Sequence, residues 1–155
     1  MRWIAVVASV PLLASLPASS PAQTPLDSAG LGQFYADWSE ATIHDGPAGY
    51  ASYFAPDGMI LPPEAPPVTG HEAIAEWLRR TLAESAYITR PDAVVVDDLH
   101  ILRGWAVQRS SVHGHRIPKA GGDPVPFEAK YLDVLRRNDQ GRWEFVYRMW
   151  SRNGP

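Results

Sequence analysis

The order of two hydrophobic patterns is what most constrains the fold of this chain of 155 residues. Up to about residue 85, apolar side chains recur every three or four residues, which predicts helices. From Ala93 onward, the chain is rich in β-branched residues separated by short polar turns, which predicts strands. Helices followed by a run of antiparallel strands indicate an α+β fold, with the helices packed on one face of a strongly curved, mainly antiparallel sheet.

The helical part divides at residues 44–47, where the sequence His-Asp-Gly-Pro ends one helix and starts the next. The first predicted helix has one apolar stripe, made by Leu31, Phe34, Tyr35 and Trp38. A short aromatic helix is expected over residues 50–54, and a short strand over residues 59–61. A third helix, predicted to begin near residue 70 and end near residue 85, buries Trp77 among other apolar side chains.

Four strands are predicted in the second half of the chain. Residues 93–102 and 105–112 form one pair, joined by a tight turn, and residues 127–136 and 143–150 form another. Residues 113–126 hold several glycines and prolines and are expected to form a loop.

The first 22 residues have the features of a secretory signal peptide. Arg2 precedes a short apolar run over residues 4–16, and Ser20-Pro21-Ala22 offers a cleavage site. The run is short and contains Pro11, so we expect no stable membrane insertion after cleavage. The expectation is an exported protein, periplasmic or secreted, with one domain over residues 23–155.

Composition excludes several classes of function. A formal net charge of -3 argues against a nucleic-acid partner. The absence of cysteine excludes disulfides, thiolate metal sites and cysteine nucleophiles. No dinucleotide fingerprint or phosphate-binding glycine loop is present, so we expect no cofactor. His113 and His115 have the spacing of two ligands on one strand face, but no third ligand is in view, and we expect no metal site.

Two segments resemble a known superfamily. Residues 38–74, WSEATIHDGPAGYASYFAPDGMILPPEAPPVTGHEAI, and residues 131–151, YLDVLRRNDQGRWEFVYRMWS, are similar to nuclear-transport-factor-2-like proteins. The SnoaL-like and ketosteroid-isomerase-related branch is the nearest. The resemblance implies a cone, in which a bent sheet wraps a pocket that helices close. It also implies a homodimer formed through the sheet.

The resemblance also suggests candidate catalytic residues. Asp133 matches an oxyanion-side carboxylic acid of the ketosteroid isomerases, and Tyr131 shares its strand face two residues away. His100 is the best histidine candidate. The general-base position of those isomerases falls near Pro62, and proline cannot take a proton. A water-activating relay like that of the limonene-epoxide hydrolases would need a second carboxylate near Met149, where none occurs.

Aromatic residues give the strongest compositional signal, with five of the six tryptophans outside the predicted signal peptide. A small cone with this many rings predicts an apolar pocket with a few polar groups, suited to a small apolar or aromatic ligand. The expected lining residues are Trp38, Tyr53, Leu61, Pro62, Trp77, Trp105, Tyr147 and Met149.

Three hypotheses about function follow from the sequence. In the first, the domain binds a small molecule and has no complete catalytic site, which the proline at the base position favours. In the second, it is a cofactor-free isomerase, lyase or hydrolase that uses Asp133, His100 and Tyr131. In the third, the outer face of the sheet binds a partner protein. The second hypothesis requires Asp133 to face a cavity and to titrate above an ordinary aspartate.

Overall fold

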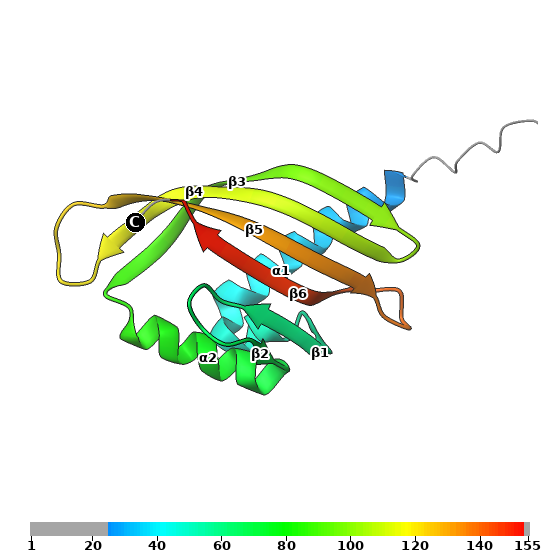
Figure 1. The fold of residues 1–155 in the computed structure, drawn as a ribbon, viewed down its shortest axis with the longest axis horizontal. Coiled ribbons are helices and arrows are strands. Elements are labelled where there is room, and N and C mark those ends of the chain that lie inside the picture. The colour runs from blue at the N-terminus through cyan, green and yellow to red at the C-terminus, as the bar shows by residue number, and fades with distance from the viewer. Residues whose placement is uncertain (1–24, 154–155) are drawn as a thin grey trace, which may run out of the picture.

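The computed structural model describes residues 25–153, which form two helices and one six-stranded sheet (Figure 1). The strand order is β2-β1-β6-β5-β4-β3; β1 runs parallel to β6 and every other neighbouring pair is antiparallel. This is the α+β architecture predicted from the sequence. The elements in chain order are α1 (Pro25–Ala51), β1 (Phe54–Leu61), β2 (Val68–Thr69), α2 (His71–Glu84), β3 (Tyr87–Leu102), β4 (Trp105–Pro118), β5 (Val125–Arg137) and β6 (Trp143–Arg152).

Helix α1 crosses one face of the curved sheet, and α2 lies beside β1 and β2 (Figure 1). The predicted break in α1 is confirmed: Gly46 has φ 61° and ψ -137°, a conformation that disfavours any side chain. The break turns the second segment of α1 so that Tyr50 and Trp38 meet. The indole Nε1 of Trp38 donates a hydrogen bond to the Tyr50 carbonyl at 3.3 Å.

The four predicted strands of the second half are present, but β3 and β4 are longer than expected. β4 continues through residues 113–118, so the prediction of a loop over residues 113–126 was wrong for that segment. Gly114 explains the error, because it permits a close approach of strands instead of ending one. A Cβ at this position would lie 2.2 Å from the Arg90 carbonyl oxygen on β3.

β1 also begins earlier than predicted. Phe54 is its first residue, so the aromatic segment over residues 50–54 leads from the end of α1 into a strand. Phe54 is opposite Phe145 on β6, and the two rings lie 5.0 Å apart between centroids. Tyr53 fixes this junction, since its carbonyl accepts a hydrogen bond from the Phe145 amide at 2.9 Å.

The apolar core lies between α1, α2 and the inner face of the sheet. Its largest fully buried apolar side chains are Leu31, Phe54, Ile60, Ile74, Leu135 and Phe145. Residues opposite one another on neighbouring strands share a face, so the register defines both faces of the sheet. The inner face carries Gln108, Asp133 and Arg148 in one row, which continues on β1 with the core residue Ile60.

The predicted signal peptide lies outside the described residues. Among the residues that are described, no helix is long and apolar enough to cross a membrane.

Candidate functional site

Four polar side chains are buried on the inner face of the sheet. Gln108, Ser110, Asp133 and Arg148 are 4%, 3%, 1% and 8% exposed, respectively. Gln108 and Ser110 lie on β4, Asp133 on β5 and Arg148 on β6. Asp133 is opposite both Gln108 and Arg148, so the four form one contiguous group, which we call the inner polar cluster. Buried polar groups in a domain this small are uncommon and call for a chemical explanation.

Asp133 is held at one oxygen and unpartnered at the other. The Tyr35 hydroxyl and Nη1 of Arg148 each donate a hydrogen bond to Oδ2 of Asp133 at 2.8 Å. Oδ1 of Asp133 is fully buried and has no hydrogen-bond partner. A carboxylate oxygen in this state has the capacity to accept a hydrogen bond from a bound molecule.

Arg148 lies among aromatic rings. Its guanidinium carbon is 4.6 Å from the ring centroids of both Trp38 and Tyr131, and 5.2 Å from that of Phe145. The negative faces of these rings offset part of the cost of burying the cation. Asp133 offsets more of it, so the buried ion pair carries no net charge.

Burial and charge shift the titration of the cluster. Burial raises the pKa of the Asp133 carboxyl from its ordinary value, and Arg148 and the Tyr35 hydroxyl oppose that rise. Burial lowers the pKa of Arg148, but the Asp133 carboxylate together with Tyr50, Tyr35 and Tyr131 more than offsets this effect, so the pKa lies above its ordinary value and the guanidinium stays charged. Burial, and then the charge of Asp133, raise the pKa of Tyr35 far above its ordinary value, so its hydroxyl remains a donor. Burial also raises the pKa of Tyr50 to about 12.

Gln108 and Ser110 add further unused hydrogen-bonding capacity. Across residues 25–153, the structure shows no hydrogen bond from either side chain. An amide and a hydroxyl can each both donate and accept. Together with Oδ1 of Asp133, they offer three neighbouring positions that can bind a polar group.

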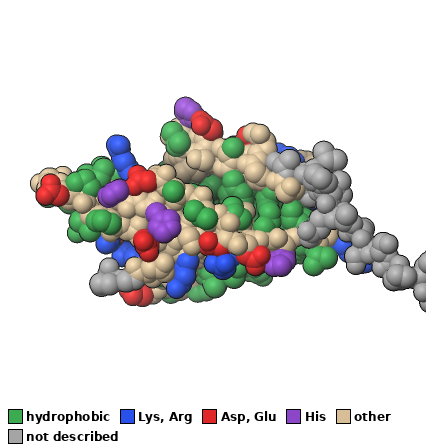
Figure 2. Space-filling model, turned by 90° about the horizontal axis from the view of Figure 1, so that it is seen from above, with side chains coloured by type: hydrophobic (Ala, Val, Ile, Leu, Met, Phe, Trp, Pro, Cys, Tyr) green, Lys and Arg blue, Asp and Glu red, His purple; other side chains and the backbone are tan. Residues whose placement is uncertain are grey.

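Aromatic rings adjoin the cluster. Tyr131 stacks on Trp150 with 6.2 Å between ring centroids, and Trp150 meets Trp77 of α2 at 5.7 Å. Seen from the β3 edge, the molecule is hollowed between α1 and the sheet, and hydrophobic side chains are visible in the hollow (Figure 2). The arrangement combines apolar walls with a few polar groups, as small-molecule sites do.

The structure brings some of the predicted site residues together. Asp133, Tyr131 and Trp38 belong to one contact group with Arg148, and Trp77 joins it through Trp150. Pro62 is buried just after β1. Tyr53 lies away from the cluster, in a separate cleft between α1 and the β5–β6 turn.

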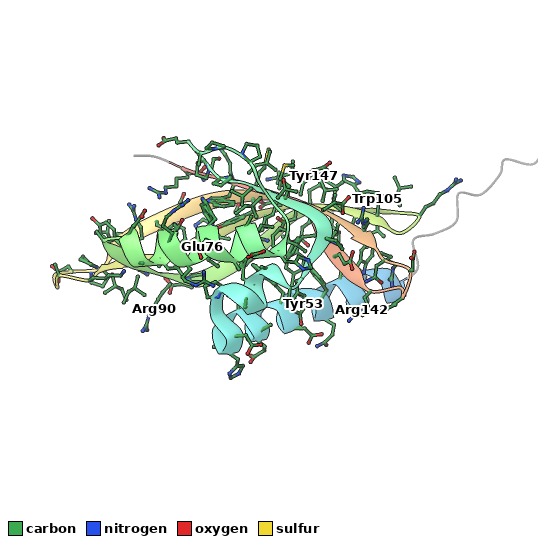
Figure 3. All side chains as sticks on the ribbon, turned by 90° about the horizontal axis from the view of Figure 1, so that it is seen from below. Tyr53, Glu76, Arg90, Trp105, Arg142 and Tyr147 are labelled. Carbon is green, nitrogen blue, oxygen red and sulfur yellow. The ribbon has the colours of Figure 1, made fainter. Side chains whose placement is uncertain are left out.

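Other predicted residues lie on the opposite face of the sheet. His100, Tyr147 and Met149 occupy outer rows of the register, as do Trp105 and Leu61. Figure 3 shows Trp105 and Tyr147 on the side of the sheet away from α1. His100 is exposed and pairs with Asp98 at 3.1 Å, so the structure does not bring it to Asp133.

A β-bulge determines which residues of β6 face inward. The register shifts at Val146: Phe145 is opposite Leu135, and Tyr147 is opposite Val134. The extra residue reverses the alternation, so Phe145 and Arg148 both face inward. Simple alternation from the core residue Phe145 would instead point Tyr147 and Met149 inward.

Some polar side chains of the cluster could not be identified from the sequence. Arg148 could be named only as one of three arginines, with Arg136 and Arg137, that were available to pair with Asp133, and the structure shows that Arg148 is the partner. Gln108 and Ser110 lie on the same strand face two residues apart, between the apolar Ala106 and Val112, and this alternation was a usable signal. Tyr35 was identified only as part of the apolar stripe of α1. Nothing in the sequence indicated that its hydroxyl reaches a strand 98 residues away.

The two histidines with metal-ligand spacing have other partners. His113 pairs with Glu128 at 3.3 Å, and His115 pairs with Asp92 at 2.5 Å. In the part of the chain that the structure describes, no group of three or more His, Cys, Asp or Glu side chains is placed to hold a metal ion.

Comparison with solved structures shows the same fold in other bacterial proteins. A ketosteroid isomerase-like protein from Erwinia carotovora atroseptica superposes with a TM-score of 0.72 and 20% identity, over 85% of this chain and 100% of that one. A protein from Catenulispora acidiphila in complex with S-DNPA superposes with a TM-score of 0.66 and 22% identity, over 83% of this chain and 95% of that one. ActVI-ORFA from Streptomyces coelicolor superposes with a TM-score of 0.64 and 18% identity, over 84% of this chain and 98% of that one.

The family comparison is more specific than these structural likenesses. No curated protein matches the chain. The model of the SnoaL-like domain matches residues 31–146, which include α2, most of α1 and three members of the inner polar cluster, Gln108, Ser110 and Asp133, whereas Arg148 follows the matched segment. The chain therefore belongs to the SnoaL-like domain family, within the nuclear-transport-factor-2-like superfamily.

Proposed function

We propose that this domain binds a small, mainly apolar organic molecule between α1 and the inner face of the sheet, without transforming it. The observation that carries the proposal is unused hydrogen-bonding capacity on one face of the sheet: Oδ1 of Asp133 is fully buried without a partner, and the buried residues Gln108 and Ser110 form no side-chain hydrogen bond within residues 25–153. Buried polar groups without partners are costly, and a ligand that satisfies them explains their presence.

The charge of the site favours a neutral polar group on the ligand. Arg148 already balances Asp133, so a charged ligand would leave a net charge in an aromatic, water-poor environment. A hydroxyl or amide N–H can donate to Oδ1 of Asp133 without that cost. The surrounding rings of Trp38 and Tyr131 suit an aromatic or aliphatic body.

The same contacts argue against acid–base catalysis by Asp133. Its Oδ2 atom is bound by Arg148 and Tyr35, and a guanidinium at 2.8 Å makes the carboxylate a weaker base than an unpaired buried aspartate. His100, the other candidate base, lies on the outer face. Binding is therefore the function that the geometry favours over an isomerase, lyase or hydrolase.

The test compares two probes that differ by one donor, 2-naphthol and naphthalene, by quenching of tryptophan fluorescence. Asp133→Asn should weaken 2-naphthol binding by about tenfold or more, since it removes a charged acceptor, and should leave naphthalene binding unchanged. Asp98→Asn, an exposed change, is the matched control. Equal affinities of the two probes for the unmodified protein, or equal effects of the two variants, would contradict the proposal. Chemical conversion of 2-naphthol that depends on Asp133 would replace it with the enzymatic alternative.

We also propose that two copies of the domain associate through the outer face of the sheet. Trp105, Tyr147 and Met149 are 45%, 44% and 43% exposed there, beside Val107 and Leu132. An exposed apolar patch of this kind marks an interaction surface. Sedimentation of the purified protein tests this, and a monomer at micromolar concentration would contradict it.

Export is the third part of the proposal, and it depends on the features of residues 1–22. Expression in a bacterium, followed by N-terminal sequencing of the exported protein, tests it. The expected mature chain begins at Gln23, and an uncleaved cytoplasmic product would contradict it.

A further inference from the structure

A second cleft lies apart from the inner polar cluster, between the first part of α1 and the β5–β6 turn. It has a volume of about 620 Å³, within the range of small-molecule sites. Its apolar lining is provided by Phe34, Tyr53 and Trp143, and charged residues of both signs surround them. None of the four residues of the inner polar cluster lines this cleft, so a ligand could bind here independently of one at the cluster.

The indole of Trp143 carries an unpartnered buried donor in this cleft. Trp143 is 6% exposed, and its Nε1 atom is fully buried with no hydrogen-bond partner. The guanidinium of Arg137 lies over the same ring at 4.5 Å from the centroid, which fixes the ring plane. Buried indole N–H groups ordinarily have an acceptor, so this one is available to a ligand.

A second donor in the cleft is charged. The Arg142 guanidinium has no hydrogen-bond or ion-pair partner among residues 25–153. Figure 3 shows Tyr53 and Arg142 at the same end of the molecule. Burial and then Asp37 raise the pKa of the Tyr53 hydroxyl while Arg142 lowers it, as expected where the hydroxyl lies near both charges.

The acidic groups of the cleft, by contrast, already have donors. Asp37 accepts a hydrogen bond from the Gln33 amide at 2.7 Å, and Glu144 accepts one from the Asn138 amide at 2.6 Å. Nε1 of Trp143 and the Arg142 guanidinium, by contrast, have no partner at any atom among the described residues, and these two donors call for a ligand rich in acceptors. The two carboxylates nearby also limit the negative charge that the ligand can carry, which disfavours a multiply charged phosphate.

We propose that the cleft between α1 and the β5–β6 turn is a second binding site, whose ligand is a small planar monocarboxylate. Its ring packs against Phe34 and Tyr53, and its carboxylate accepts hydrogen bonds from Nε1 of Trp143 and from the Arg142 guanidinium. A bond from arginine to a carboxylate is charge-assisted and stronger than one to a neutral acceptor.

The test follows the indole N–H resonance of Trp143 by NMR while benzoate, benzamide or benzylamine is added. The resonance is assigned as the one missing from Trp143→Phe. Benzoate should shift it saturably, benzamide should bind about tenfold more weakly, and benzylamine should leave it unmoved. Arg142→Gln should weaken benzoate binding by about tenfold and remove its advantage over benzamide. Arg90→Gln is the matched control, because Arg90 is an exposed arginine at the other end of the molecule (Figure 3).

Three results would overturn the proposal: a Trp143 resonance that benzoate does not move, an equal response to benzylamine, or the same benzoate affinity in Arg142→Gln as in the unmodified protein. Arg142 is exposed, so its variant keeps the test valid even if Trp143→Phe fails to fold. Loss of 2-naphthol binding in Asp133→Asn with benzoate binding retained would separate this site from the inner polar cluster.

Discussion

The inner face of the sheet buries four polar side chains, whereas the outer face exposes a band of apolar ones. An isolated globular domain would favour the opposite arrangement. Burying polar groups costs free energy, and apolar groups that stay exposed do not contribute the favourable free energy of their burial. The inner face offsets part of its cost internally, through the contacts of Asp133 with Arg148 and Tyr35. The outer face has no such internal compensation. The difference indicates that the inner face serves a small ligand and the outer face a protein partner.

The largest expected effect comes from breaking the buried ion pair. Arg148→Met leaves Asp133 buried without its cation, which should lower the free energy of unfolding by about 3–5 kcal/mol. Adding Asp133→Leu should recover most of this loss, since an apolar pair of similar size replaces the ionic one. Urea unfolding measures both variants.

The outer face supplies the control for the ion pair. Arg109 pairs with Asp97 at 3.0 Å in an exposed position, so Arg109→Met should cost less than about 1 kcal/mol. Equal losses in Arg109→Met and Arg148→Met would mean that burial does not distinguish the two faces.

The next effect concerns the helix that covers the inner face. Gly46→Ala places a side chain at φ 61°, which should destabilise the domain by about 1–3 kcal/mol through backbone strain alone, because no atom lies within 4 Å of the added Cβ. Gly32→Ala is matched, with equally open space but a helical backbone, and should stabilise by about 0.5–1 kcal/mol. Thermal unfolding compares them. A stabilising Gly46→Ala would show that the break in α1 is not needed to position Tyr50.

A smaller effect is expected at the outer face. Trp105→Ala should weaken self-association by about tenfold, since large aromatic residues dominate the energy of interfaces. Ile43→Ala removes an apolar side chain from α1 that is 70% exposed, more than the 45% of Trp105, and should leave association unchanged. Sedimentation equilibrium distinguishes them. An identical response would remove the evidence that the apolar band is an interface.

The helices and strands could be predicted from the sequence more fully than the face of the sheet on which each side chain lies. The helical stripe of α1, its break at Gly46 and the strand pairs all follow from local patterns, and the structure confirms them. Gly114 was misinterpreted because a glycine that ends a strand and one that admits a neighbouring strand look the same in sequence. Only the register separates the two meanings.

The candidate site could be predicted only in part, because it too depends on the strand register. Asp133 and Tyr131 were placed correctly because no bulge lies between them on β5. Arg148 could be named only as one of three arginines available to Asp133, because the extra residue at Val146, which reverses every later side chain of β6, leaves no signal in the sequence. The hydrogen bond from Tyr35 to Asp133 depends on how α1 packs across the sheet, which no local pattern encodes.

The smallest expected effect compares a carboxylate outside the core with the one inside it. A hydrogen bond from Arg136 holds the pKa of exposed Asp57 below its ordinary value of 3.8. A lowered pKa in the folded state means that the pair stabilises the protein above that pH and that this contribution disappears as the pH falls below it. Asp57→Asn should therefore reduce the acid sensitivity of the melting temperature slightly below pH 4.

Asp133 should show the opposite sign, because burial raises its pKa. Its contribution is greatest below the ordinary pKa of an aspartate and declines as the pH rises through the higher value of the folded state. Just above pH 4, the stability of the unmodified protein should therefore fall as the pH rises. Asp133→Asn should make this fall smaller, whereas Asp57→Asn should leave it unchanged. Melting temperatures between about pH 3 and pH 7 measure both variants. If the melting temperatures of the two variants change with pH in the same direction, Arg148 and Tyr35 lower the pKa of Asp133 more than burial raises it. The inner carboxylate would then be a structural ion pair with no preference for a neutral group on a ligand.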